Sequence, residues 1–102
     1  MTTLKIRVLN SFWQKTIGLL GQKKAEPVLF RTRFGIHTFG LKFPIDVLIL
    51  DSKNRVTKIK TNLPPFHFFF WNPLFNTVIE LPVGEIAKLN IRSSDTLEII
   101  PC

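Results

Sequence analysis

Three side chains in this sequence have the types needed for acid–base or metal chemistry. His37 and Asp46 come from one otherwise apolar stretch, residues 33–51, and Glu80 lies in a second apolar run. An imidazole and two carboxylates can transfer protons or hold a divalent cation. The three residues are far apart in the sequence and match no standard ligand spacing. This acid–base or metal cluster is therefore a hypothesis to be weighed against a structural one.

The structural alternative is favoured for Asp46. Its neighbours are strand-forming apolar residues, and an unpaired charge buried among them would be costly. We expect its carboxylate to accept hydrogen bonds from backbone amides or from the Thr38 hydroxyl, and thereby to fix the turn near Gly40. For Glu80 the expected ion-pair partner is Lys42 or Arg33.

Recognisable catalytic motifs are absent from the sequence. It contains no glycine-rich phosphate loop, nucleophile elbow, His-Glu-x-x-His segment or paired-carboxylate pattern. The only cysteine, Cys102, excludes an intramolecular disulfide and a cysteine-based zinc site. A protein without catalytic activity, metal or cofactor is therefore favoured over an enzyme.

Length and composition describe a small globular protein. The 102 residues, 45% of them hydrophobic and 21% charged, are enough to bury a core as a single domain over residues 1–102. Prolines and polar residues interrupt the longest apolar runs, so we expect no transmembrane helix. The first residues alternate charged and β-branched side chains rather than forming a secretion signal, which makes the cytoplasm the expected location.

Most of the net charge of +7 comes from the first third of the chain. Residues 1–34 hold seven lysines and arginines against Glu26 alone. This excess would attract an anionic partner, although a basic surface that only aids solubility is the simpler interpretation. No nucleic-acid-binding motif accompanies the charge, so nucleic acid is a less favoured partner that stays open. The candidate anion-binding residues are Arg31, Arg33 and Lys42.

Six aromatic side chains are concentrated in residues 63–75, a segment interrupted by three prolines. We expect a long loop here that is neither strand nor helix. Its four consecutive aromatic residues cannot all point the same way. If the fold is a small β-barrel, these side chains either cover one of its open ends or leave an exposed apolar patch for a partner. The candidate partner-binding residues are Phe66, Phe68, Phe69, Phe70 and Trp71.

Local sequence patterns predict short strands and two short helices. Asp51–Arg55 is a polar turn typical of a β-hairpin. Gly35 fits a bulge or a close approach between strands, Gly40 fits a turn, and Asn90 fits a left-handed helix cap. The strands are expected at residues 4–9, 28–38, 45–50, 56–60, 77–81 and 96–100, and the helices at 12–20 and 85–89.

These elements predict an α+β fold. Strands outnumber helices, and short turns join most neighbouring strands. A mixed, mainly antiparallel sheet that curls toward a small β-barrel, with two short helices, satisfies both features.

Several segments of the chain follow a family pattern. Residues 15–21 are Lys-Thr-Ile-Gly-Leu-Leu-Gly, residues 39–51 run from Phe-Gly-Leu-Lys through Pro-Ile-Asp, and residues 78–84 are Val-Ile-Glu-Leu-Pro-Val-Gly. A short helical segment and Asp95 follow. In this order they resemble domain of unknown function family 192 over most of the chain. The resemblance implies a compact β-rich domain and brings no activity with it.

The chain departs from that family pattern in two places. Many members carry Phe-Trp-Met-Lys-Asn-Thr before Pro-Leu-Asp, whereas residues 36–41 here are Ile-His-Thr-Phe-Gly-Leu, similar to a His-Thr-Phe-Gly variant of the family. Ser94 stands where a glycine often precedes the aspartate. A role tied to the Lys-Asn pair therefore does not transfer to this chain.

The favoured function is a non-catalytic binding module. In it, the aromatic segment and the basic surface contact a protein partner, a second copy of the chain or an anionic membrane. The alternative is a small enzyme or metal-dependent site centred on His37, Asp46 and Glu80.

Overall fold

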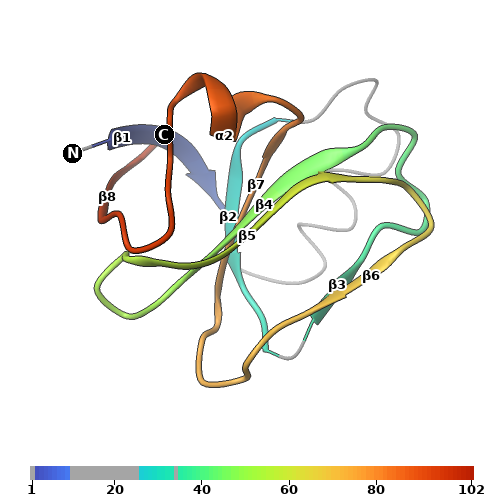
Figure 1. Ribbon diagram of the computed structural model, residues 1–102, viewed down its shortest axis with the longest axis horizontal. Coiled ribbons are helices and arrows are strands. Elements are labelled where there is room, and N and C mark those ends of the chain that lie inside the picture. The colour runs from blue at the N-terminus through green and yellow to red at the C-terminus, as the bar shows by residue number, and fades with distance from the viewer. Residues whose placement is uncertain (1, 10–25, 34) are drawn as a thin grey trace.

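The computed structural model describes residues 2–9, 26–33 and 35–102. The strands are β1 (Thr2–Val8), β2 (Val28–Arg31), β3 (Gly35–His37), β4 (Ile45–Leu50), β5 (Val56–Leu63), β6 (Phe68–Phe70), β7 (Thr77–Pro82) and β8 (Leu97–Pro101), and the helix is α2 (Glu85–Lys88). Six strands form the main sheet in the order β5-β4-β7-β2-β1-β8, whereas β3 and β6 form a separate two-stranded ribbon (Figure 1).

The main sheet is mixed and curled. Strand β1 pairs in parallel with β2 and β8, and the pairs β2–β7, β4–β7 and β4–β5 are antiparallel. The two edge strands approach each other at one end, where Arg55 and Thr96 form an isolated bridge and the Val56 N–H donates to the Asp95 carbonyl at 2.7 Å. The sheet is therefore a half-barrel.

The predicted mixed, mainly antiparallel and curled sheet is confirmed, but the α+β class with two helices is not. The described residues form mostly strands, with α2 as one short helix. The other predicted helix, residues 12–20, lies outside the described residues. Asn90 follows α2 in the left-handed conformation (φ 55°), as the sequence predicts for a cap. The described fold is thus mostly β.

Strand β4 is buried along its whole length, because both faces of the main sheet are covered. Ile45, Val47 and Ile49 belong to a core shared with the β3–β6 ribbon. Leu48 and Leu50 belong to a second core shared with β1, β8 and α2. Full burial of such a side chain contributes roughly 1.5–3 kcal/mol relative to exposure. The ribbon is one of the two covers that this apolar strand requires.

The inner side of the ribbon packs on the main sheet. Ile36 and Phe69 are paired across the two strands and are both buried in the shared core. The Trp71 indole N–H donates to the Phe75 carbonyl at 2.7 Å, which satisfies the polar atom of a buried ring. The prediction that this aromatic segment forms no strand is wrong for Phe68–Phe70, because the prolines flank those residues rather than interrupt them.

Asp46 is a buried carboxylate that accepts three backbone hydrogen bonds. Its Oδ1 accepts from the Asn62 N–H at 2.9 Å, and its Oδ2 accepts from the N–H groups of Gly84 (3.0 Å) and Ile86 (3.2 Å). Asn62 belongs to a bulge of β5 opposite Asp46, and Gly84 is the N-cap of α2, which has no side-chain cap of its own. The carboxylate thus fixes both the bulge and the start of the helix.

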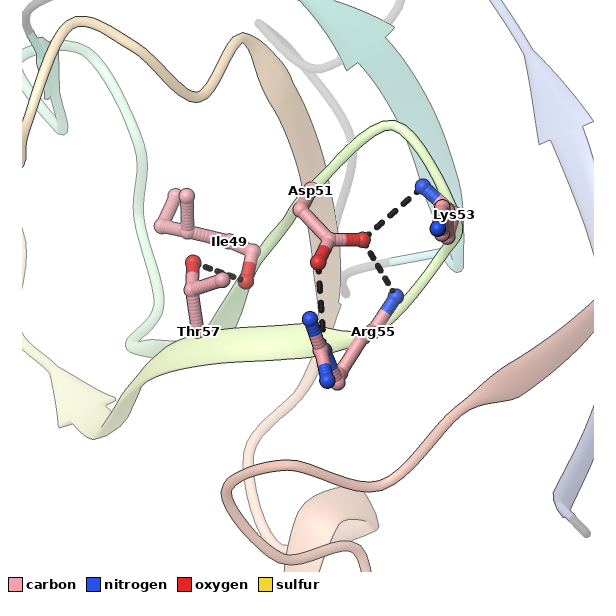
Figure 2. Close-up of polar contacts among 5 residues, drawn as sticks. All are labelled: Ile49, Asp51, Lys53, Arg55 and Thr57. Atoms are coloured by element: carbon pink, nitrogen blue, oxygen red, sulfur yellow. Dashed lines mark hydrogen bonds and ion pairs between the residues drawn. The ribbon is translucent and has the colours of Figure 1, made fainter.

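The hairpin between β4 and β5 is confirmed, and Asp51 organises its turn. Asp51 Oδ1 accepts from the backbone N–H groups of Lys53 (2.8 Å) and Arg55 (3.0 Å), and Oδ2 accepts from Arg55 Nε at 3.2 Å (Figure 2). Asn54 occupies the left-handed conformation (φ 62°), which asparagine tolerates. On the strands themselves, the Thr57 hydroxyl donates to the Ile49 carbonyl at 2.9 Å.

Removing the Asp46 carboxylate should destabilise the fold strongly. Asp46→Ala leaves three backbone N–H groups without their acceptor, and we expect the free energy of unfolding to fall by roughly 3 kcal/mol. Asp46→Asn keeps one acceptor oxygen and should lose about half of that. Urea denaturation followed by circular dichroism measures both. The control is Glu98→Gln on the exposed side of β8, and an Asp46→Ala loss no larger than the control's would contradict this role.

The contribution of Asp51 should depend on pH. The hydrogen bond from the Arg55 backbone N–H is the main cause that holds the Asp51 pKa below its usual 3.8. Because the unfolded chain then binds a proton at higher pH than the folded one, Asp51 stabilises the fold above about pH 4, and this contribution disappears as the pH falls. Unfolding curves of the parent and Asp51→Asn should therefore differ most near neutrality and converge in acid. A difference that stays constant across this pH range would refute the assignment.

Candidate functional site

Four phenylalanine rings lie exposed on the outer side of the β3–β6 ribbon and its flanking turns. Their exposed fractions are 42% for Phe39, 70% for Phe66, 60% for Phe68 and 62% for Phe70. We call these four residues the aromatic face. Contiguous exposed apolar surface of this kind marks contact sites more often than ordinary protein surface does.

The alternation of the ribbon separates the consecutive aromatic residues. Phe69 and Trp71 point inward and are 8% and 7% exposed, whereas Phe68 and Phe70 point outward. The segment is therefore neither only a cover for the core nor only a contact surface. Phe69 and Trp71 belong to the core, and the outward rings remain available. Phe39 was not among the residues predicted from the sequence, although the same alternation places Gly35, His37 and Phe39 on one side.

The outward rings form a continuous chain of contacts. The rings of Phe68 and Phe70 are stacked, with centroids 5.7 Å apart and planes 10° from parallel. Phe39 meets Phe68 edge-on at 5.0 Å and lies 6.1 Å from Phe66. The His37 ring extends the chain at 5.5 Å from Phe39. These distances and angles are those of favourable aromatic pairs, so the face is an ordered surface.

Gly35 makes room for this arrangement. It lies opposite Phe70 in the ribbon, and a Cβ atom at this position would lie 2.5 Å from Cδ1 of the Phe70 ring and 2.8 Å from the Phe69 carbonyl oxygen. The prediction of a close approach at Gly35 is confirmed. Any larger residue would displace the Phe70 ring from the face.

Thr38 holds the turn that presents the rings. Its fully buried hydroxyl donates to the Pro64 carbonyl at 2.6 Å and accepts from the His67 N–H at 2.9 Å. Its backbone N–H donates to the His67 carbonyl at 2.9 Å, and its carbonyl accepts from the Phe66 N–H at 3.3 Å. Of the two kinds of donor expected for Asp46, the backbone amides are confirmed. The Thr38 hydroxyl is not a donor to Asp46, because it is engaged with residues 64–67.

Phe66 adopts an unfavourable backbone conformation. Its φ of 64° lies in the left-handed region, where a bulky side chain is rare, and its ring is exposed. Glycine or asparagine would adopt the same conformation at lower cost. The residue type at this position is therefore not explained by the backbone.

The segments that form the aromatic face carry basic residues and no carboxylate. Residues 27–45 and 52–79, which include the whole ribbon, contain no aspartate or glutamate. Lys58 is held beside the ribbon, since its Nζ donates to the Phe70 carbonyl at 3.0 Å and lies 5.1 Å from the centroid of the Phe69 ring. All the lysines and arginines of these two segments are exposed, namely Arg31, Arg33, Lys42, Lys53, Arg55, Lys58 and Lys60.

The structure does not bring the proposed acid–base or metal residues together. His37 is exposed on the outer side of the ribbon. Asp46 and Glu80 are buried on opposite faces of the main sheet, because Asp46 is aligned with Leu81 whereas Glu80 is aligned with Val47. Among residues 2–9, 26–33 and 35–102, no group of three or more His, Cys, Asp or Glu side chains is placed to hold a metal ion. The expected ion pair of Glu80 stays a prediction.

Among the described residues, no helix has both the length and the apolar character needed to cross a membrane.

Several proteins are similar to this chain in sequence or in fold. A UPF0127 protein of Pyrococcus abyssi is 29% identical over 102 residues, which cover 94% of this chain and 86% of that protein. A crystal structure of a protein of unknown function from Novosphingobium aromaticivorans has a TM-score of 0.76 at 18% identity and covers 89% of this chain and 71% of its own. A Sinorhizobium meliloti structure, provisionally described as a transcription regulator, gives 0.77 at 19% identity, with coverages of 89% and 78%.

At these identities the two solved structures show a shared fold alone. The family model DUF192, described as "Uncharacterized ACR", matches residues 1–99 of the chain. Placement in the His-Thr-Phe-Gly variant stays a prediction. The match spans nearly the whole sequence and confirms the resemblance seen in its motifs, so the protein belongs to domain of unknown function family 192.

Proposed function

We propose that this protein is a non-catalytic binding module whose aromatic face contacts its partner. The observation that carries the proposal is the exposure of Phe66, Phe68 and Phe70, each at 60% or more, in an ordered ring arrangement. Their neighbours Phe69 and Trp71 already complete the core beneath them. The outward rings thus contribute little burial to the fold, and contact with another surface accounts for them.

The energetics of Phe66 support the same conclusion. Full burial of a phenylalanine is worth roughly 1.5–3 kcal/mol, and Phe66 gains little of it in this fold. A left-handed backbone conformation adds a cost of about 1–2 kcal/mol for a residue with a side chain. A protein selected only for stability would have glycine or asparagine at this turn. A ring that contacts a partner offsets both terms.

The acid–base alternative has less support from the geometry. Asp46 already accepts hydrogen bonds from three backbone N–H groups. His37 is exposed on the outer side of the ribbon, and the core beneath the ribbon separates it from the main sheet. A reaction at His37, Asp46 and Glu80 would require their side chains to face one common space, and they do not. Binding through the aromatic face needs no rearrangement.

Substitution of Phe66 separates stability from contact. Phe66→Asn should leave the free energy of unfolding unchanged or raise it by up to about 1 kcal/mol, because asparagine tolerates the left-handed conformation. The matched inward change, Phe69→Ser, should lower it by roughly 3 kcal/mol or more. Urea denaturation of both variants measures the contrast. Equal losses for the two variants would mean that Phe66 serves the fold rather than a partner.

Site-specific photo-cross-linking tests the binding role directly. The photoreactive p-benzoyl-phenylalanine replaces Phe68 in one variant and Val83 in a control, because Val83 is also hydrophobic and 48% exposed but lies beside α2. In cells, the probe at position 68 should form adducts with a protein or a lipid, identified by mass spectrometry. Adding Phe66→Ser and Phe70→Ser should abolish them. Equal adduct yields at positions 68 and 83, or yields insensitive to the serine changes, would contradict the proposal.

A further inference from the structure

We infer that the partner of the aromatic face is an anionic lipid bilayer. The inference rests on the proposed function and names the occupant of the same site. Three features of the face favour this occupant, namely the chemistry of its rings, the hydrogen bonding of the turn that carries Phe66, and the charge of the ribbon segments.

The four rings of the aromatic face are purely hydrocarbon, and the His37 imidazole is exposed beside Phe39. The chain contains no tyrosine, and the Trp71 indole points inward with its N–H already bonded to the Phe75 carbonyl. The residues that contribute most to binding at protein interfaces are enriched in Trp, Tyr and Arg. A face of four phenylalanine rings is suited to the boundary between headgroups and acyl chains, where apolar side chains are buried without specific partners.

The turn that carries Phe66 has few backbone groups left for water to satisfy. Pro64 and Pro65 have no N–H, and the N–H groups of Phe66 and His67 are both bonded to Thr38. Thr38 also bonds the carbonyls of Pro64 and His67, and His67 Nδ1 lies 2.8 Å from the Pro65 carbonyl.

The Phe70 carbonyl in β6 accepts a hydrogen bond from Nζ of Lys58, a residue of β5. A backbone group that leaves water unpaired is costly, so internal pairing is what a segment entering the interface requires. The same bonds hold the turn in water, and they leave few of its backbone groups to be desolvated at a bilayer.

The charge pattern favours anionic headgroups. No carboxylate occurs within residues 27–45 or 52–79, so nothing in the ribbon segments would repel a negative surface. The Arg33 carbonyl accepts a hydrogen bond from the N–H of Gly35, the first residue of the ribbon, at 2.9 Å. Arg33, Lys42 and Lys60 are all exposed. Basic residues on a segment that enters a bilayer are attracted by the negative surface potential of an anionic leaflet.

The place of the ribbon in the molecule allows this contact. In Figure 1, β3 and β6 lie at the side of the molecule away from both termini, α2 and β8. A bilayer that covered the ribbon would therefore leave α2 and β8 outside the lipid.

Flotation with lipid vesicles tests the inference. Vesicles of phosphatidylcholine, with or without phosphatidylglycerol, are mixed with the full chain at low and high salt. We expect at least about tenfold more protein bound when phosphatidylglycerol is present, and a marked loss at high salt. Phe68→Ser combined with Phe70→Ser should reduce binding about tenfold. The control Val83→Ser should bind like the parent, and thermal unfolding of each variant verifies its fold.

Two further variants assign the contributions of charge and insertion. Lys42→Gln combined with Lys60→Gln should weaken binding by about tenfold or more and flatten the salt dependence, and neither lysine holds the ribbon as Lys58 does. Phe68→Trp should keep binding, and its added emission should shift to shorter wavelength on vesicle addition. Binding without that shift would overturn insertion of the ring.

The remaining outcomes separate this inference from the proposed function. A folded parent that floats with neither vesicle type, or equally with both, overturns the anionic bilayer as occupant. If position 68 then cross-links to a protein, the binding module stands with a protein partner. If sedimentation shows a dimer that Phe68→Ser dissolves, a second copy is the occupant. If position 68 also yields no specific adduct, the proposed function fails as well.

Discussion

Apart from Asp46, strand β4 is apolar on both faces, so the main sheet requires a cover on each side. Residues of β1, β8 and α2 supply one cover, and the inner side of the β3–β6 ribbon supplies the other. A two-stranded ribbon can bury only one of its faces, because successive side chains point in opposite directions. Burial of Phe69 therefore forces Phe68 and Phe70 outward. The outward direction of these side chains thus follows from the way the core is closed. Strand geometry does not require them to be phenylalanine, so their residue type is the feature that points to a function.

Polar residues within the apolar segments hold this arrangement together. Asp46 joins the bulge of β5 to the first turn of α2, and Thr38 joins the end of β3 to the turn before β6. Each is buried and each bonds backbone groups, so each removes unsatisfied donors or acceptors from the interior. Asp46, a candidate for acid–base chemistry in the sequence, is in the structure part of the framework that joins β5 to α2.

Local features of the fold could be predicted from the sequence, whereas features set by distant pairing could not. The polar turn at Asp51–Arg55, the close approach at Gly35 and the left-handed Asn90 follow from residue types and their immediate neighbours. The partners of Asp46 lie 16, 38 and 40 residues away, and no local pattern specifies them. Strand β6 was missed because its flanking prolines resemble a loop, and Phe39 was missed because its neighbours in the face come from another segment.

The outward rings are apolar, the backbone of the turn that carries Phe66 is internally bonded, and the ribbon segments carry basic residues and no carboxylate. The most direct measurement is nuclear magnetic resonance with anionic bicelles that carry a paramagnetic headgroup. The account predicts selective broadening of the ring and amide signals of Phe66, Phe68 and Phe70, with Ile86 in α2 unaffected. Uniform broadening across the protein, or broadening centred on α2, would contradict the assignment of the aromatic face as the contact surface.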